Sequence, residues 1–229
     1  MKVNNSLANK SNLKTGDILL CHKANDYVAG KIEKVTKSKY CHAAIFYGDS
    51  HVAESLALDG LKKGKVCKTN IQDLINRYDH VAVLRQPDAW ATPDRINALK
   101  SFIDKIIARE VKYNLKGIYR FVKRKKLHEN SIHDKLNTFF NGELRVFLPE
   151  KSNYFCSEFV CDCFISTGFI EPSAAVLYQA DTYSPGDLGK DPTFGTFWGY
   201  LAHSQHYKVP EDDVFYQQST FDDIFLNNK

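Results

Sequence analysis

One cysteine occupies a place where a nucleophile can be activated. Cys156 lies in the run 155–160, Phe-Cys-Ser-Glu-Phe-Val, at the start of a helix predicted over 154–167 and ended by Gly168. Unpaired backbone amides and the positive end of the helix dipole favour a thiolate in such a first turn. A thiolate can attack a carbonyl carbon. The alternative is an inert cysteine on a core face, because free cysteine is often buried.

A histidine lies in an early apolar strand that could supply a base. His42 falls within 40–47, a segment that is apolar on both faces and is predicted to be a buried strand. A polar ring there needs a partner. It can be a general base beside a thiol, or a core histidine bonded to a backbone carbonyl.

A carboxylate follows on the next predicted strand, 51–55. If Gly48-Asp49-Ser50 is a three-residue turn, Ala44 faces Glu54, and His42 and Glu54 become diagonal neighbours on one face. With an even-length turn, Glu54 moves to the opposite face. A carboxylate beside an imidazole fixes its tautomer and stabilises its cation. The alternative is an ordinary solvated strand residue, and the parity of the turn decides between the two.

These residues must be positioned by a mixed set of elements. Period-two and apolar segments predict strands over 17–22, 40–47, 51–55, 66–69, 80–84 and 196–201. Helical spacing predicts helices around 28–35, over 71–78, from Thr92 to about Ala108, and over 154–167. Without regular βαβ alternation, an α+β fold is expected. We expect a single catalytic domain over 1–229, with a loose leader over 1–13, a poorly patterned insertion near the site over about 119–150 and a C-terminal tail over about 211–229.

Three segments together resemble a known family. Thr15-Gly16-Asp17-Ile18-Leu19-Leu20, then 42–49 (His-Ala-Ala-Ile-Phe-Tyr-Gly-Asp), then 155–160 look like the permuted NlpC-like branch of the papain superfamily. The YiiX/YebB-like cysteine hydrolases are the most similar group, and lecithin:retinol acyltransferase-like enzymes are relatives. In this branch the histidine strand precedes the cysteine helix, as it does here. Tyr113-Asn114 and 184–188 resemble family segments more loosely.

The resemblance implies a fold and a site. The fold would be circularly permuted papain-like, with a small antiparallel sheet or barrel that carries His42, packed against the helix that starts at Cys156. The site would be a Cys-His-Glu triad of Cys156, His42 and Glu54, with no cofactor and no metal. The Cys156 backbone amide is the expected first oxyanion donor. Tyr40, Tyr113 and Ser157 are candidates to line the site.

The overall composition narrows the other possibilities. The net charge of +4 is only mildly basic, so no nucleic-acid partner is expected. Neither a signal peptide nor a bilayer-spanning apolar stretch is visible, so a cytoplasmic location is expected, with non-classical export left open. The six cysteines are expected to be thiols. The basic run Lys123, Arg124, Lys125, Lys126 is either a solvated face or a site for an anionic ligand.

Three functions remain open at this point. The first is a peptidase or amidase that cleaves through a thioester. The second is a lipid esterase or acyltransferase with the same triad, which would need an apolar acyl channel. The third is a non-catalytic binding module on the same fold.

Overall fold

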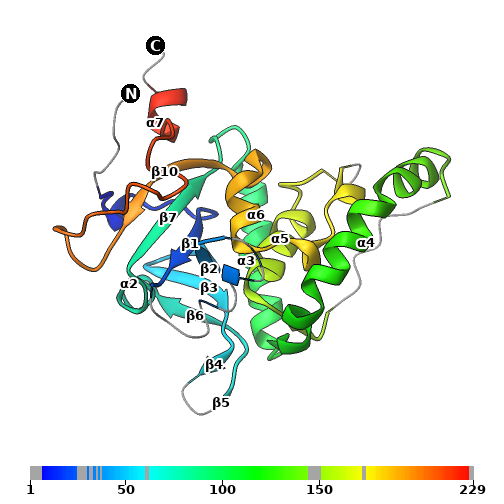
Figure 1. The fold of residues 1–229 in the computed structure, drawn as a ribbon, viewed down its shortest axis with the longest axis horizontal. Coiled ribbons are helices and arrows are strands. Elements are labelled where there is room, and N and C mark those ends of the chain that lie inside the picture. Colours follow the sequence, from blue (N-terminus) through cyan, green and yellow to red (C-terminus); the bar gives the residue numbers. More distant parts are fainter. Residues whose placement is uncertain are drawn as a thin grey trace. The chain divides into compact units, whose positions relative to one another are not determined.

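The computed structural model describes residues 7–24, 30, 33–34, 36, 38–59, 62–143, 151–171 and 174–226 (Figure 1). The helix expected around 28–35 lies largely outside these residues. The chain forms two compact units. The first comprises Met1–Ala53, Lys68–Ala91 and Pro185–Lys229, and the second comprises Glu54–Cys67 and Thr92–Ser184. The protein is therefore of mixed α+β architecture, as expected.

A six-stranded sheet, most of whose residues belong to the first unit, has the strand order β10-β7-β1-β2-β3-β6. Its strands are β1 (Ile18–His22), β2 (Tyr40–Gly48), β3 (His51–Ser55), β6 (Val66–Asn70), β7 (His80–Arg85) and β10 (Thr196–Leu201). β1 pairs antiparallel with β2 and β7, and β7 pairs antiparallel with β10. All six strands lie where the sequence predicts them. The expectation of an antiparallel sheet carrying His42 is confirmed.

One face of this sheet is covered by helix α2 (Ile71–Arg77). In the register, Leu19 lies opposite Ala44 and Cys21 opposite His42, so these side chains share a face. Ile71, Leu74 and Ile75 of α2 belong to the same buried cluster as residues of that face. Asn70 accepts a hydrogen bond from the Gln72 amide at 2.8 Å and caps the helix. The face that bears His42 is therefore a packed, water-poor layer.

A buried polar network fixes the C-terminal segment to the sheet. Asp213 accepts hydrogen bonds from the hydroxyls of Tyr40 (2.9 Å) and Tyr200 (2.6 Å), and its carboxylate lies 3.1 Å from Nε2 of His80. Burial raises the pKa of Asp213, but the hydrogen bonds outweigh it, and the net pKa is lowered. The carboxylate is thus held in its charged form between strands β2, β7 and β10.

The described residues 7–13 and 211–226 are more ordered than their composition suggests. In the expected leader, the Ala8 amide donates to the Tyr200 carbonyl at 2.7 Å, and Leu13 is buried in the core. The prediction of a loose leader is therefore wrong for residues 7–13, because this short segment pairs with the β10 edge. In the expected tail, Phe215 and Phe221 are buried, and a short helix, α7 (Phe221–Phe225), forms.

Helices dominate the second unit, with short strand pairs between them. The helices are α3 (Pro93–Ala108), α4 (Leu115–Phe140) and α5 (Cys156–Ser166), and the strands are β4 (Leu58–Asp59), β5 (Lys62–Lys63), β8 (Lys112–Tyr113) and β9 (Asn153–Tyr154). The first unit also holds a short helix, α6 (Pro185–Lys190). Among the described residues, no helix has both the length and the apolar character needed to cross a bilayer.

The expected insertion contains the longest helix. Residues 119–140 were predicted to be poorly patterned, yet they belong to the 26-residue α4. The prediction is wrong because only Gly117, Phe121 and His128 of this helix are buried, while apolar residues such as Tyr119 and Val122 also lie on its exposed side, so the helical period is hard to detect. The remainder of the expected insertion, 144–150, lies outside the described residues.

Candidate active site

The start of α5 is fixed by a two-strand pairing just before it. β8 and β9 run parallel, with Tyr113 opposite Tyr154. The amide of Asn114 donates to the Tyr154 carbonyl at 2.8 Å, and Ser55 Oγ donates to the same carbonyl at 2.8 Å. Cys156 follows as the first residue of α5 and is 5% exposed. The sequence therefore correctly predicts that Cys156 lies in the first turn of a buried helix.

Glu158 holds this first turn in place. Its Oε2 accepts hydrogen bonds from the Phe155 amide and from Nδ2 of Asn114, both at 3.2 Å. A glutamate three residues into a helix that bonds back to the N-cap amide is half of a capping box. Because Glu158 is only 3% exposed, these bonds form out of water and restrict the backbone on either side of Cys156.

Lys151 forms ion pairs with two acidic residues of α5. Lys151 Nζ lies 3.2 Å from Glu158 Oε1 and 2.8 Å from Asp162 Oδ2. Burial raises the pKa of both carboxyls above the ordinary values, and Lys151 only partly offsets this. The pKa of Lys151 is raised, because attraction to the two carboxylates outweighs its own burial. Burial also raises the pKa of the Tyr154 phenol, next to Asp162. Lys151 is thus the shared cationic partner of two buried carboxylates, those of Glu158 and Asp162.

Asn114 and Gly117 were not among the predicted site residues, although they support the helix start. Asn114 Oδ1 accepts from the Gly117 amide at 2.9 Å and caps α4, while its Nδ2 reaches Glu158. A Cβ on Gly117 would lie 2.6 Å from Asn114 Nδ2 and 2.9 Å from a Phe155 ring carbon. Glu158, three residues after Phe155, was the visible sequence signal of a capping interaction. The contact between α4 and α5 had no such signal.

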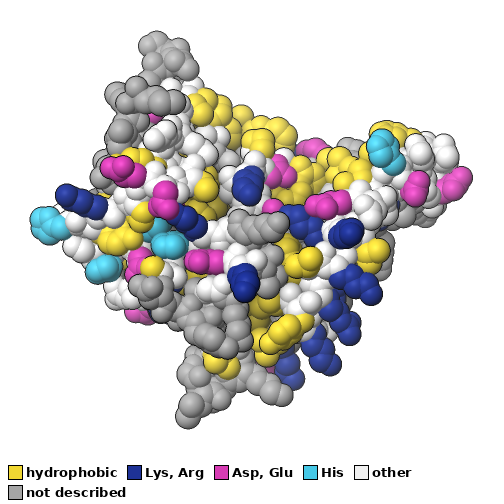
Figure 2. Space-filling view, viewed as in Figure 1, with side chains coloured by type: hydrophobic (Ala, Val, Ile, Leu, Met, Phe, Trp, Pro, Cys, Tyr) yellow, Lys and Arg dark blue, Asp and Glu magenta, His cyan; other side chains and the backbone are white. Residues whose placement is uncertain are grey.

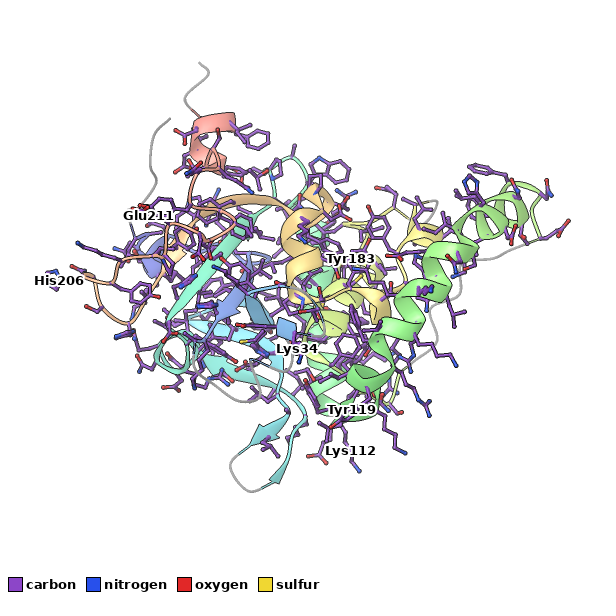
Figure 3. All side chains as sticks on the ribbon, viewed as in Figure 1. Lys34, Lys112, Tyr119, Tyr183, His206 and Glu211 are labelled. Carbon is purple, nitrogen blue, oxygen red and sulfur yellow. The ribbon has the colours of Figure 1, made fainter. Side chains whose placement is uncertain are left out.

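The Ser157 hydroxyl forms a hydrogen bond within the second unit. Its Oγ donates to the Tyr183 carbonyl at 2.7 Å, and the residue is 1% exposed (Tyr183 is labelled in Figure 3). The hydroxyl therefore ties α5 to the 3-10 turn Ala180–Thr182, which Tyr183 follows. We do not include this hydroxyl in the reacting groups.

His42 lies in the first unit and is stacked on an aromatic ring. The rings of His42 and Tyr78 are 5.6 Å apart at an interplanar angle of 7°. His42 is buried, with 8% of its surface exposed. Tyr78, directly after α2, was not predicted to contact His42, since its position depends on how α2 packs on the sheet. Cys156 and His42 belong to different units, and their pairing is part of the proposal below.

The turn between β2 and β3 differs from the expected one. Two residues, Asp49 and Ser50, connect the strands instead of three, with φ of 50° and 59°. Gly48, at the end of β2, has a φ of 110°, a conformation that favours glycine. Val52 nevertheless belongs to the buried cluster that contains Ala44 and Phe46. Val52 therefore packs on the same face as Ala44, which is the face relation that the three-residue turn predicted.

Glu54 is a buried carboxylate. It is 0% exposed, so the alternative of an ordinary solvated strand residue is wrong. Along a strand, alternate residues point to the same side, so Glu54 points to the side of Val52. Its neighbour Ser55 bonds the Tyr154 carbonyl, two residues before Cys156. The end of β3 is thereby tied to the segment that leads into α5.

Two further predicted groups have other partners. The Tyr40 hydroxyl donates to Asp213 in the buried network described above, so we leave Tyr40 out of the proposed site.

The residues of the basic run 123–126 have different surroundings along α4. Arg124 pairs with Asp181 at 2.7 Å, and Lys125 Nζ lies 5.8 Å from the centre of the Phe121 ring. Lys123 and Lys126 are exposed to solvent.

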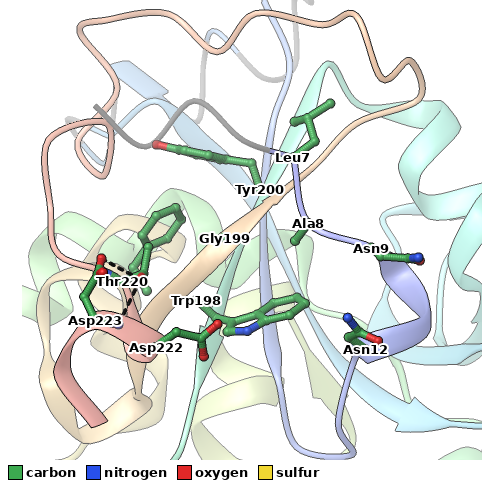
Figure 4. A pocket seen from close by; sticks show the side chains of 11 residues that line it. Leu7, Ala8, Asn9, Asn12, Trp198, Gly199, Tyr200, Thr220, Asp222 and Asp223 are labelled. Carbon is green, nitrogen blue, oxygen red and sulfur yellow. Dashed lines mark hydrogen bonds between the residues drawn. The ribbon is translucent and has the colours of Figure 1, made fainter. Parts of the chain in front are cut away.

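A hollow in the first unit has none of the predicted site residues in its lining (Figure 4). It has a volume of about 260 Å³ and is walled by the 7–12 segment, β10 and α7. The Trp198 side chain lies between Asn12 and Asp222 (Figure 4).

All six cysteines carry free thiols. Within the described ranges, no cluster of three or more histidine, cysteine or acidic side chains could hold a metal ion.

Comparison with known proteins gives one informative relative. No family model matches the chain. The chain is 30% identical over 186 residues to a protein of Escherichia coli strain K12 named "Probable lipoprotein peptidase YaeF". The matched region covers 77% of this chain and 62% of the relative, so the chain spans less than two-thirds of that protein's length. The two proteins are distant homologues.

Proposed function

We propose that this chain is a cysteine-dependent hydrolase of the peptidase or amidase type, with Cys156 as nucleophile, His42 as base and Glu54 as the group that orients the base. The distant homologue named a probable peptidase supports the reaction class. The proposed fold is the permuted papain-like one, which requires the histidine strand to precede the cysteine helix. The order of β2, β3 and α5 along the chain is compatible with that fold.

The observation that carries the proposal is the environment of Cys156. It is the first residue of an 11-residue helix, so the partial positive charge of the helix N-terminus acts on its sulfur. Glu158 and Asn114 fix the backbone on both sides of it. A nucleophile held in one orientation loses less entropy when it reaches the transition state.

The proposed reaction has two steps. His42 accepts the Cys156 proton, and the sulfur attacks the amide carbonyl, so that a C–S bond forms and a tetrahedral oxyanion develops. The Cys156 amide donates a hydrogen bond to that oxyanion. The oxyanion collapses, the C–N bond breaks, and the imidazolium of His42 protonates the leaving amine. Water, deprotonated by His42, then attacks the thioester and releases the acid and the free thiol.

Glu54 has the remaining role. A buried carboxylate near the imidazole would hold one tautomer and stabilise the imidazolium that forms during proton transfer. Its complete burial supports this role, since a carboxylate without water needs a cationic or hydrogen-bonding partner.

Covalent labelling tests the nucleophile. Wild type, Cys156→Ala and Cys163→Ala are treated with thiol-reactive probes that carry either a peptidyl or a fatty-acyl recognition group, and the adducts are mapped by mass spectrometry. Cys163 is the matched control, because it lies on the same helix but is fully buried, and burial raises its thiol pKa. Labelling is expected at Cys156 in wild type and in Cys163→Ala, and its persistence in Cys156→Ala would refute the assignment. Preference for the fatty-acyl probe would favour a lipid substrate.

Kinetics tests the other two residues. Cleavage of a peptide substrate is expected to fall by roughly 10³-fold or more in Cys156→Ala and in His42→Ala. Glu54→Gln is expected to weaken cleavage less, with the far-ultraviolet circular dichroism unchanged. An unaltered rate in Glu54→Gln would show that another group orients His42.

A further inference from the structure

The first half of α4 exposes a surface of unusual composition. Residues 115–127 contain five lysines or arginines besides Lys125 and no acidic residue. Four large apolar side chains on this segment are exposed: Leu115 by 54%, Tyr119 by 88%, Val122 by 56% and Leu127 by 58%. We call the exposed set the basic-apolar face of α4; its residues are Leu115, Lys116, Tyr119, Arg120, Val122, Lys123, Lys126 and Leu127.

Helical spacing brings these residues to one side. Leu115, Tyr119 and Val122 follow at intervals of four and three residues, so they line up on one stripe. The buried residues Gly117 and Phe121 lie on the opposite side of the helix. Figure 2 shows dark-blue basic side chains along the edge formed by α4, with hydrophobic side chains beside them, and Figure 3 labels Tyr119 near its N-terminal end. Helix α4 therefore has apolar residues on two sides: one side is buried against the protein, and the other carries an exposed apolar stripe.

The cations of this face point outward. Lys116, Arg120, Lys123 and Lys126 are all exposed, and none of them forms an ion pair with another residue in the described part of the chain. Arg124, by contrast, turns inward to Asp181. Four positive charges within three turns make a local field that attracts anions.

The combination of side chains selects among anionic partners. Exposed leucine, valine and tyrosine gain free energy only when an apolar phase removes them from water. A nucleic acid would satisfy the cations but would leave Leu115 and Val122 in water, and residues 115–127 offer no row of exposed aromatic rings for base stacking. In a lipid interface, apolar side chains enter the acyl boundary while the long basic side chains reach the phosphate groups. An anionic lipid surface satisfies both kinds of side chain.

We propose that the basic-apolar face of α4 docks the protein on an anionic lipid surface, with the helix lying in the plane of the interface. This surface is independent of the catalytic residues: it needs no residue of the proposed triad and can be tested without a substrate.

Vesicle flotation with the full chain tests the proposal. Binding is measured to phosphatidylcholine vesicles with and without phosphatidylglycerol. We expect binding only when phosphatidylglycerol is present, with weaker binding at high salt. Lys123→Gln/Lys126→Gln should weaken binding by roughly 30-fold, since each basic residue near such a surface contributes about five-fold. The control Lys190→Gln/Lys208→Gln removes two exposed lysines of the first unit and should bind as wild type does.

The apolar half is tested separately. Tyr119→Ser/Val122→Ser keeps every charge and should also lose most vesicle binding, because insertion contributes part of the affinity. Binding to a DNA duplex as strong as binding to phosphatidylglycerol vesicles would overturn the proposal. So would equal binding to both kinds of vesicle, no binding to either, or an apolar variant that binds like wild type. Circular dichroism of each variant shows that α4 is still formed.

Discussion

Helices α4 and α5 belong to the same unit and pack near one another at Gly117 and Phe155, yet they are opposite in burial. Every residue of α5 except Ser166 is buried, whereas α4 buries three of its 26 residues. The polar side chains of α5 must therefore find partners inside the protein, as Glu158, Asp162 and Ser157 do. Many polar side chains of α4, such as Lys116, Arg120 and Lys123, are instead exposed to water. This contrast supports both proposals, in which α5 holds Cys156 in one orientation and α4 presents an exposed surface.

The largest effect on stability is expected from removing the acid that fixes the start of α5. Glu158→Ala leaves the Phe155 amide and Asn114 without their acceptor and removes one of the two partners of Lys151. We expect a loss of about 3 kcal/mol in the free energy of unfolding, measured by urea denaturation. The matched change on α4 is Glu129→Ala, an exposed acid, which should stay within about 0.5 kcal/mol. Similar values for both would contradict the comparison.

A smaller effect is expected where the two helices touch. Gly117→Ala places a Cβ against Asn114 and Phe155, and we expect a loss of about 2 kcal/mol because both neighbours must move. The same measurement on Asn130→Ala, at an exposed position of α4, should show no loss, since alanine favours helix. If Gly117→Ala were neutral, the α4–α5 contact would be looser than the structure indicates.

A pH-dependent effect is expected at Asp162. Its pKa in the folded protein is raised above 3.8, so the folded state binds more protons than the unfolded state in this window. The stabilisation linked to this group is complete below the unfolded pKa and declines as pH rises through the folded pKa. The difference in unfolding free energy between wild type and Asp162→Asn should therefore fall as pH rises from about 3.8. Urea denaturation over this pH range measures it, and an increasing difference would show that Lys151 dominates.

The smallest effect is expected on the exposed side of α4. Val122→Ala removes apolar surface that water already contacts, so the free energy of unfolding should change by less than about 0.5 kcal/mol. Thermal unfolding in the absence of lipid measures it. A loss above about 1 kcal/mol would mean that Val122 packs against the protein, and Val122 would then not belong to the basic-apolar face.

Much of the local structure could be predicted from the sequence. The strand that carries His42, the helix that begins at Cys156 and the helix capped by Thr92 all follow from short-range patterns of apolar and capping residues. The turn between β2 and β3 was predicted to have three residues, whereas two residues, Asp49 and Ser50, form it, because the residue type of Gly48 does not reveal that it still belongs to the strand. Helix α4 was missed because its exposed side is not uniformly polar.

The sequence by itself determined the order of the elements, the place of Cys156 in a first helical turn and the strand that bears His42, because each depends on neighbours within a few residues. Only the tertiary structure decided that Glu158 and Asn114 clamp that turn, that Tyr78 stacks on His42, and that Glu54 is wholly buried. These contacts join residues distant in the chain. Their formation depends on how strands and helices pack, which hydrophobic periodicity does not encode.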